Sequence, residues 1–325
     1  MTEPVLLGAD IGGTSTKVVV ARSTCEVLSY ASGSGGNINS SPDALPTIAA
    51  TLEEATEGVP AVTAAHIGVA GAGPASLATV ADALTQMWGA RGGLSVSDDL
   101  ATAFAASSPT GTGLLLLSGT GAVSAAFDRL EMVGRTDGMG WLLGDIGSGT
   151  WIGLEAMRAA AAALDARGEP TVLTDAVPAA LAQVVSPTDV TDPRQRLISQ
   201  AYSLSPRQYG LLAPVVVANI EDPVCSDILA RARAGLHASA RRCRPLVTGG
   251  DLVLTGGLLA PGGPLRAELV TDLSADPAMA GLTVVPKERM NPPILGALVL
   301  AAAGAGTSCD RDALARSLAE ATPFT

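Results

Sequence analysis

Three clusters of glycine and small polar residues, each placed directly after a short apolar run, constrain the fold of this chain most strongly. They are D-I-G-G-T-S-T-K at 10–17, S-G-T-G at 118–121 and T-G-G-L-L at 255–259. A glycine turn after a strand leaves backbone N–H groups open to an anion, because no Cβ blocks the approach. One such turn is most often only a turn. The joint occurrence of three, in this order and spacing, is far more specific.

The first two clusters fit neither of the common nucleotide-binding loops. Lys17 is followed by three valines, so the chain re-enters a strand, whereas a P-loop leads into a helix. The S-G-T-G cluster lacks the third glycine of a dinucleotide fingerprint and the acidic residue about 20 positions further on. We therefore interpret both clusters as mirrored β-hairpins that hold phosphate.

Strand-like and helix-like segments alternate along the 325 residues. The apolar runs predict strands at 5–9, 17–21, 27–30, 66–70, 94–97, 114–117, 122–127 and 252–255. Helical spacing predicts helices at 44–56, from about 100, at 151–166, 227–240 and 293–303, with a short one at the end and polar helical sequence over 171–210. This alternation is typical of the α/β class, and the length suggests two domains or one large one.

Composition excludes several classes of function. A net charge of −11 repels nucleic-acid phosphates and anionic lipid. The four cysteines form no C-x-x-C pair, and two histidines are too few for a His-rich metal site. The N-terminus does not read as a signal peptide, and the longest apolar stretch, near 211–220, is too short to span a bilayer. We expect a cytoplasmic protein that binds neither nucleic acid nor membrane.

With these motifs the sequence resembles the superfamily of sugar kinases, actin and Hsp70 chaperones. The stretch G-W-L-L-G-D-I-G-S-G-T-W-I-G at 140–153 is similar to the signature of the N-acetylglucosamine kinase and BadF/BcrA-type ATPase family. Within it, the chain most resembles the actinobacterial glucosamine kinases. The zinc-binding cysteines of the related ROK kinases are missing. The resemblance implies two ribonuclease H-like domains, 1–117 with about 291–325 and 118–290, with ATP and sugar in the cleft between them.

The resemblance also implies which residues hold ATP and Mg²⁺. Asp10 would hold Mg²⁺ through water, the alternative being a carboxylate that caps the turn. The β- and γ-phosphates would contact Gly12, Gly13 and Thr14, with a hydroxyl from Thr16 and a charge from Lys17, unless Lys17 is a solvated strand residue. The second domain would hold phosphates with Ser118, Gly119, Thr120 and Gly121, and adenosine with Gly256, Gly257 and Leu258. The arginines at 231, 233, 241, 242 and 244 read as a solvated helix face, from which one could neighbour the nucleotide.

Asp99 is the candidate catalytic base. It lies in S-V-S-D-D-L-A, where a predicted strand meets a predicted helix, and it would take the proton of the sugar's 6-hydroxyl during phosphoryl transfer. Asp98 and Asp99 suit a helix N-cap equally well. Asp98 is therefore the second candidate for the base, and it is assigned to substrate binding.

The sugar pocket is expected to include four further residues. Asn37 matches a sugar-binding Asn of the family, although an Asn in a loop turn would look the same. Asp145 resembles an acceptor for sugar hydroxyls, and Gly140 and Trp141 would line the same pocket. The family usually has Glu after that Asp, and here Ile146 follows, so the substrate is not fixed by this motif.

Glucosamine is the expected acceptor, because the extra carboxylate of Asp98 would pair with a 2-ammonium group. N-acetylglucosamine is the alternative. A BadF-type activator ATPase is a third hypothesis. Such activators carry a cysteine pair for an iron–sulfur cluster, and the absence of any cysteine near 118–153 argues against this hypothesis. A sugar-sensing binding protein would need no base. Relatives are often dimers, so a homodimer is one possible state of this chain.

Overall fold

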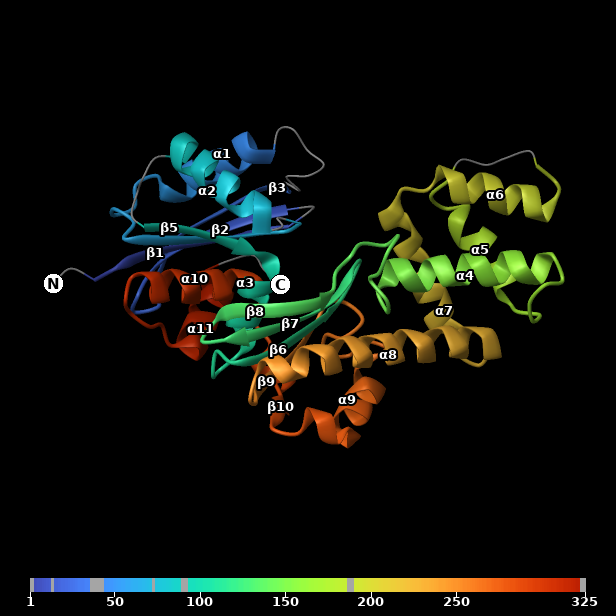
Figure 1. Cartoon of the computed structure of the whole chain (residues 1–325). Helices are drawn as coiled ribbons and strands as arrows, with labels where there is room; N and C mark the ends of the chain where they lie inside the picture. Colours follow the sequence, from blue (N-terminus) through green and yellow to red (C-terminus); the bar gives the residue numbers. More distant parts are fainter. Residues whose placement is uncertain are drawn as a thin grey trace. The chain divides into compact units, whose positions relative to one another are not determined.

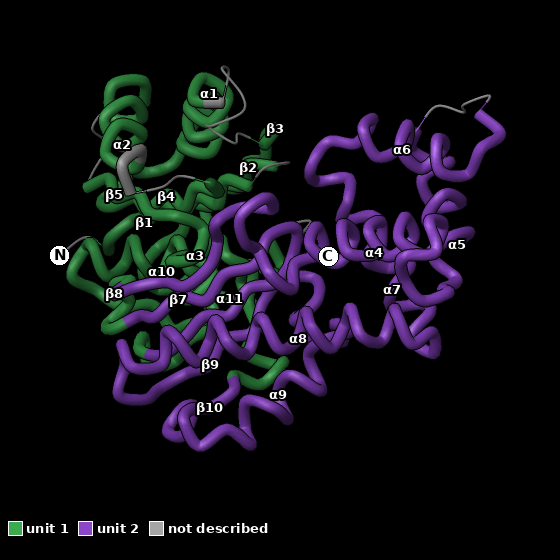
Figure 2. Tube along the Cα trace, turned by 45° about the vertical axis from the view of Figure 1, so that its right-hand side comes forward, with its two compact units in different colours: residues 1–112, 128–132, 285–325 green, residues 113–127, 133–284 purple. Residues whose placement is uncertain are grey.

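The computed structural model describes residues 3–12, 15–35, 44–71, 74–88, 93–185 and 190–321. The chain forms two compact units (Figure 2). Unit 1 contains residues 1–112, 128–132 and 285–325, and unit 2 contains residues 113–127 and 133–284. The chain thus leaves unit 1 at residue 113, returns to it briefly at 128–132, completes unit 2 and ends in unit 1. The units divide at 112/113 and 284/285. The sequence places the domain limits at 117/118 and about 290/291, and those limits remain predictions.

Unit 1 is built on a five-stranded sheet of order β3-β2-β1-β4-β5. Its strands are β1 (Val5–Ile11), β2 (Ser15–Arg22), β3 (Val27–Ser34), β4 (Ala64–Val69) and β5 (Gly93–Asp98). Strand β1 pairs antiparallel with β2 and parallel with β4, and β4 pairs parallel with β5. Its helices are α1 (Ala44–Thr56), α2 (Pro74–Trp88), α3 (Asp99–Ser107), α10 (Pro293–Gly304) and α11 (Arg311–Ala321).

Helices cover both faces of this sheet (Figure 1). Alternate residues of β1 point to opposite faces. Leu7 and Ile11 pack with apolar residues of α1 and α2, and Leu6 packs with those of α10 and α11. Strand β1 is therefore buried from both sides, which explains its almost unbroken apolar sequence.

Two glycines allow the backbone of α10 to pack directly against the backbones of α3 and β1. A Cβ built on Gly296 would lie 1.9 Å from the carbonyl oxygen of Thr102 in α3, and one on Gly8 of β1 would lie 2.8 Å from the backbone nitrogen of Leu298. Helix α3 consequently packs against α10, which itself lies on the sheet. This packing fixes the helix that begins at Asp99.

Unit 2 is built on a second five-stranded sheet, of order β10-β9-β6-β7-β8. The strands are β6 (Gly113–Ser118), β7 (Ala122–Asp128), β8 (Glu131–Asp137), β9 (Gly250–Thr255) and β10 (Leu282–Val284). Strand β6 is antiparallel to β7 and parallel to β9. The helices are α4 (Gly149–Leu164), α5 (Leu173–Leu181), α6 (Pro193–Ser203), α7 (Ala213–Ala218), α8 (Pro223–Cys243) and α9 (Arg266–Ala275).

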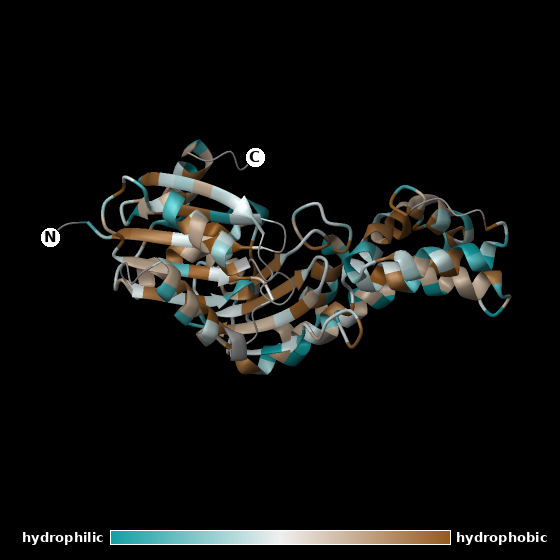
Figure 3. Ribbon diagram, turned by 90° about the horizontal axis from the view of Figure 1, so that it is seen from above, coloured by the Kyte–Doolittle hydropathy of each residue, from teal (hydrophilic) through white to brown (hydrophobic). Residues whose placement is uncertain are grey.

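Short 3-10 helices supplement these elements at Pro206–Leu212, Arg244–Leu246, Pro277–Met279 and, in unit 1, Lys287–Arg289. The core of unit 2 joins Leu114 and Leu116 of β6 to apolar residues of α4, α5 and α8. Apolar residues follow the strands in Figure 3, and polar residues lie along the outer helices. Among the described residues, no helix is both long and apolar enough to cross a bilayer.

Most elements expected from the sequence are present, and α1 has the predicted limits. Five helices and strands were not predicted: α2, β8, α7, α9 and β10. Helix α8 begins at Pro223 instead of residue 227, because the carboxylate of Asp222 accepts hydrogen bonds from the amides of Val224 and Cys225 (2.9 and 3.2 Å). Helix α4 begins at Gly149 instead of 151, with the Ser148 hydroxyl as its cap.

Candidate functional site

The first glycine turn places an acidic and a basic side chain directly opposite each other. Asp10 lies one residue before the end of β1, and its partner across the antiparallel ladder is Lys17 of β2. The turn between them is closed by a 2.9 Å hydrogen bond from the Gly12 amide to the carbonyl of Ser15. Burial raises the pKa of Asp10 to about 6, and the charge of Lys17 opposes this shift. Lys17 is thus a cross-strand neighbour of the expected metal ligand.

Other residues expected around this turn are placed less favourably or are not described. The Thr16 side chain is buried, and its hydroxyl donates to the Ser34 carbonyl at 2.9 Å. This bond engages the hydroxyl that was expected at the phosphates. Gly13, Thr14 and Asn37 lie outside the described residues, so their predicted roles stay predictions.

Two adjacent carboxylates lie at the end of β5, and the structure gives them different tasks. Asp98 is the N-cap of α3, because its Oδ1 accepts a 3.1 Å hydrogen bond from the Ala101 amide. Asp99 is the first residue of the helix. Burial raises the pKa of Asp99 to about 6, and the charges of Asp98 and Asp10 add to the effect. The sequence left the cap open between the two residues, and the structure assigns it to Asp98.

The acidic residues of unit 1 share one edge of the sheet. Strands β1, β4 and β5 run parallel, so their carboxyl ends meet at that edge, and Asp10, Asp98 and Asp99 follow from these ends. Their mutual repulsion is one reason why Asp99 holds its proton more tightly than an ordinary carboxyl group. The edge therefore combines a carboxylate of raised basicity with a second one suited to a cation.

In unit 2 the second and third glycine turns come together. Strands β6 and β9 are parallel, with Leu117 opposite Thr255, so the turns that follow them lie side by side. The Leu258 amide donates to the Ser118 carbonyl at 3.1 Å. Gly256 has a φ of +87°, and a Cβ there would lie 2.3 Å from that carbonyl oxygen. The residues predicted for phosphate and for adenosine thus form one continuous edge.

The start of α4 and the residue pair before it hold the second glycine turn through hydrogen bonds. The Gly149 amide donates to the Gly119 carbonyl at 2.8 Å, and the Ser118 hydroxyl donates to the Gly147 carbonyl at 2.7 Å. Thr120 is exposed at the tip, and Gly121 is partly exposed. The tip is therefore the accessible part of the turn.

The loop from Asp137 to Ile146 carries the signature residues and folds back onto the second turn. Asp145, with a φ of +55°, receives hydrogen bonds from the backbone amides of Ala122 and Gly140. Burial is the largest of the causes that raise its pKa. Trp141 stacks on Tyr209, with ring centroids 6.1 Å apart. Asp145 thus links the loop to the turn, while its role toward a sugar stays a prediction.

Two residues that the sequence analysis missed support these turns. The Asp137 carboxylate accepts hydrogen bonds from the amides of Asp145 (2.7 Å) and Ile146 (2.9 Å). The Arg266 guanidinium donates to the carbonyls of Leu254 (3.3 Å) and Leu259 (2.7 Å), on either side of the third turn. The D-G pair at 137–138 is a turn signal that could have identified the first. No comparable signal marks Arg266.

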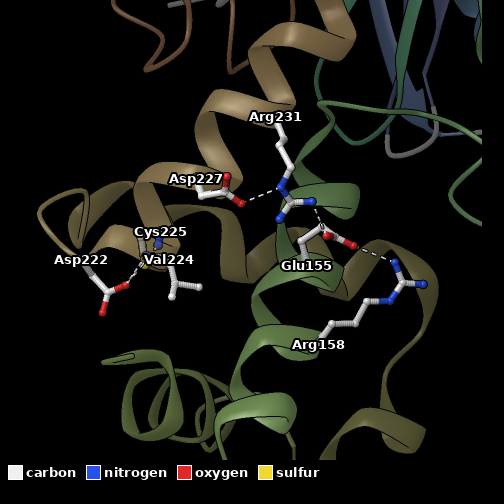
Figure 4. Close-up of polar contacts among 7 residues, drawn as sticks. All are labelled: Glu155, Arg158, Asp222, Val224, Cys225, Asp227 and Arg231. Carbon is white, nitrogen blue, oxygen red and sulfur yellow. Dashed lines mark hydrogen bonds and ion pairs between the residues drawn. The ribbon is translucent and has the colours of Figure 1, made fainter. Parts of the chain in front are cut away.

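The arginines of α8 are mostly engaged in ion pairs. Arg231 bonds to Asp227 of its own helix and to Glu155 of α4, each at 2.7 Å (Figure 4). Arg158 bonds to the other oxygen of Glu155 at 2.7 Å. Arg233 pairs with Glu268 and Asp272. These contacts describe a salt-bridged helix face, as the solvated interpretation expected.

No cluster of three or more His, Cys, Asp or Glu side chains suited to a metal occurs in the described part of the chain. Mg²⁺ at a nucleotide is commonly held by one or two carboxylates together with waters and phosphate oxygens. A buried carboxylate at a strand end, such as Asp10, fits that pattern. A separate cavity of about 520 Å³ lies along α4 and α6, and none of the predicted site residues lines it.

Curated relatives and solved structures resemble the chain. An N-acetylmuramic acid/N-acetylglucosamine kinase of Clostridium acetobutylicum is 29% identical over 181 residues, 52% of this chain and 57% of the relative. An N-acetyl-D-glucosamine kinase of Dictyostelium discoideum is 33% identical over 130 residues, 38% of each chain. The matches thus span only about half, or less, of these relatives. A provisionally assigned N-acetylglucosamine kinase from Chromobacterium violaceum superimposes with a TM-score of 0.67 at 25% identity, covering 92% of this chain and 99% of the other.

The fold and the family follow from these matches. A second structure, from Porphyromonas gingivalis, gives a TM-score of 0.61 at 18% identity over 90% of this chain and 96% of the other. The predicted α/β class with two actin-like ATPase domains is confirmed. The model of the BadF/BadG/BcrA/BcrD ATPases matches residues 7–301. The chain therefore belongs to the BadF/BadG/BcrA/BcrD ATPase family.

Proposed function

We propose that this chain is an ATP-dependent amino-sugar kinase that transfers the γ-phosphoryl group to the 6-hydroxyl of N-acetylglucosamine. The observation that carries the proposal is Asp99, a half-buried carboxylate with a pKa raised to about 6 at the acidic edge of unit 1. The family is one of ATPases, and both curated relatives are kinases of N-acetylated amino sugars. A base and a nucleotide are the two components that such a transfer requires.

Asp99 would orient the attacking hydroxyl and accept its proton as the oxygen bonds to phosphorus. A base whose pKa is near 6 is still ionised at pH 7 and binds a proton more strongly than an ordinary Asp. Asp98 would hold α3 in place through its cap. Phosphoryl transfer depends mainly on positioning and charge neutralisation, so one modest base is sufficient.

Each unit carries groups that suit a nucleotide. Asp10 would hold Mg²⁺, which supplies charge neutralisation at the phosphates when bound, and Lys17 would add a positive charge. In unit 2, the backbone of Gly119–Gly121 would contact phosphate, and Gly256, Gly257 and Leu258 would support the adenosine. Gly257 favours this role, because no atom lies within 4 Å of the position that its Cβ would occupy.

N-acetylglucosamine replaces glucosamine as the favoured acceptor for two reasons. The case for glucosamine relied on the Asp98 carboxylate as the partner of a 2-ammonium group. That carboxylate is 8% exposed and caps α3, so it is engaged within the protein. The curated relatives also favour the acetylated sugar. Asn37, Gly140, Trp141 and Asp145 remain the proposed sugar-binding residues.

A coupled assay of ADP release, run with ATP and Mg²⁺ over a panel of sugars, tests the proposal. The panel contains N-acetylglucosamine, glucosamine, N-acetylmuramic acid, N-acetylmannosamine and glucose. We expect the highest kcat/KM for N-acetylglucosamine. A clear preference for glucosamine would restore the first expectation. ADP release that no sugar accelerates would instead support an activator-type ATPase.

A further inference from the structure

A buried histidine bridges the two strands that precede the acidic edge of unit 1. His66 of β4 is 6% exposed, and it lies opposite Ser95 of β5 in the parallel ladder. Its Nδ1 is 2.8 Å from the hydroxyl oxygen of Ser95, and its Nε2 is 3.0 Å from that of Ser97. Both ring nitrogens therefore have a partner on the neighbouring strand.

One of these serines connects the histidine to the candidate base. The Ser97 hydroxyl donates to the carbonyl of Asp98 at 2.8 Å. That carbonyl belongs to the peptide that joins Asp98 to Asp99. The side chain of the same residue, Asp98, caps α3. The peptide before Asp99 is thus held by a chain of hydrogen bonds that begins at His66.

The number of available protons favours one arrangement of these hydrogen bonds. Burial lowers the pKa of His66 to about 4, so the ring is neutral at pH 7 and carries a single N–H. Ser97 donates to Asp98 at 2.8 Å, whereas the bond from Ser95 to the Ala65 carbonyl is longer, at 3.2 Å. The arrangement that keeps the shorter bond has Nε2–H donating to Ser97 while Ser95 donates to Nδ1. It leaves no ring nitrogen unsatisfied.

We propose that His66 is a positioning residue, which acts through Ser97 to fix the Asp98–Asp99 peptide and with it the direction of the Asp99 carboxylate. The inference rests on the proposed kinase function and concerns the same site. Catalytic groups must be held within about 0.5 Å of the productive geometry by neighbouring hydrogen bonds. Without the Nε2–H donor, the Ser97 hydroxyl is free to rotate away from the peptide.

Two serine variants provide a matched test, because both serines bond the same ring and only Ser97 reaches Asp98. We expect Ser97→Ala to lower kcat about 10-fold with the KM for ATP changed less than about 2-fold, and Ser95→Ala to lower kcat less than about 3-fold. His66→Leu should match Ser97→Ala, and His66→Gln, which retains an amide donor, should recover most of kcat. The double variant His66→Leu/Ser97→Ala should be no worse than either single one.

Amide hydrogen exchange at Ala101, measured in the free protein without substrate, tests whether Ser97 stabilises the start of α3. We expect exchange there to accelerate about 10-fold in Ser97→Ala and to stay near the wild-type rate in Ser95→Ala. Equal exchange or equal kcat in the two serine variants would overturn the positioning role, even if His66→Leu fails to fold. A wild-type protein that phosphorylates no sugar would refute the proposed function, and the exchange experiment would still decide whether His66 holds the start of α3.

Discussion

The two units carry their functional chemistry in different ways. In unit 1, side chains at the carboxyl ends of parallel strands supply charge: Asp10 near the end of β1, Asp98 as the last residue of β5, and Asp99 directly after it. In unit 2, the corresponding edge consists of glycine turns after β6 and β9, held by carbonyls and amides. An acidic side-chain edge suits proton transfer and a cation, whereas a backbone edge suits an anion.

This difference predicts opposite responses to substitution. Removing a buried charge in unit 1 should abolish chemistry while sparing or improving stability, since a buried carboxylate with a raised pKa destabilises the folded state at neutral pH. Adding a methyl group to a turn in unit 2 should disturb the backbone itself. The predictions below test this contrast, beginning with the largest expected effect.

Asp99→Asn should lower kcat by about 10²-fold or more, because the amide cannot accept the hydroxyl proton. ATP binding should survive, and the free energy of unfolding at pH 7.5 should rise by about 1 kcal/mol or more, because a buried charge is removed. Steady-state kinetics and urea denaturation measure both. Asp98→Asn is the matched control, because Asn caps helices as well as Asp does, so it should keep most of kcat. Equal losses in the two variants would contradict the division of roles.

Gly256→Ala should weaken nucleotide binding about 10-fold and destabilise the protein by about 1–3 kcal/mol. The added Cβ would lie 2.3 Å from the Ser118 carbonyl oxygen, at a φ of +87°. Gly257→Ala meets no atom within 4 Å and should leave stability unchanged. Calorimetry with a non-hydrolysable ATP analogue and thermal unfolding compare the pair. Similar behaviour of both variants would argue against the backbone account of unit 2.

The acid limb of the kcat/KM profile should fall near pH 6, where Asp99 and Asp10 take up protons. The pKa of each lies well above that of an ordinary aspartate, so their contribution to stability increases as pH falls from above 6 toward 4. Activity and stability should therefore change in opposite directions between pH 7.5 and 5. Rates and denaturation midpoints across that range test the sign. An acid limb near pH 4 would show that neither carboxyl group is perturbed.

Glu155→Gln should have the smallest effect, a loss of about 0.5 kcal/mol in stability with kcat unchanged. Glu155 joins α4 to α8 through Arg231, whose side chain is 46% exposed, and exposed ion pairs contribute little. The substitution also removes the ion pair with Arg158, whose side chain is 64% exposed, while Arg231 keeps its pair with Asp227. Thermal unfolding at low and high salt measures the contribution. A fall in kcat would mean that this ion pair serves the site.

The sequence predicted the elements whose apolar pattern is continuous. Strand β8 was missed because its alternate residues are exposed and a glycine interrupts it. The choice of cap between Asp98 and Asp99 depended on a one-residue helix boundary, which adjacent identical residues cannot specify. Arg266 and His66 act through contacts with strands distant in sequence or with backbone carbonyls. Such contacts leave no local pattern, so the turns could be predicted, whereas the supporting roles of Arg266 and His66 could not.

The product formed from ATP, Mg²⁺ and N-acetylglucosamine tests the central claim most directly. Coupled ³¹P and ¹H nuclear magnetic resonance identifies the atom that carries the phosphoryl group. The account predicts a phosphomonoester coupled to the two protons of carbon 6, formed about 10²-fold more slowly with Asp99→Asn. Inorganic phosphate as the only product, formed at the same rate without sugar, would contradict it.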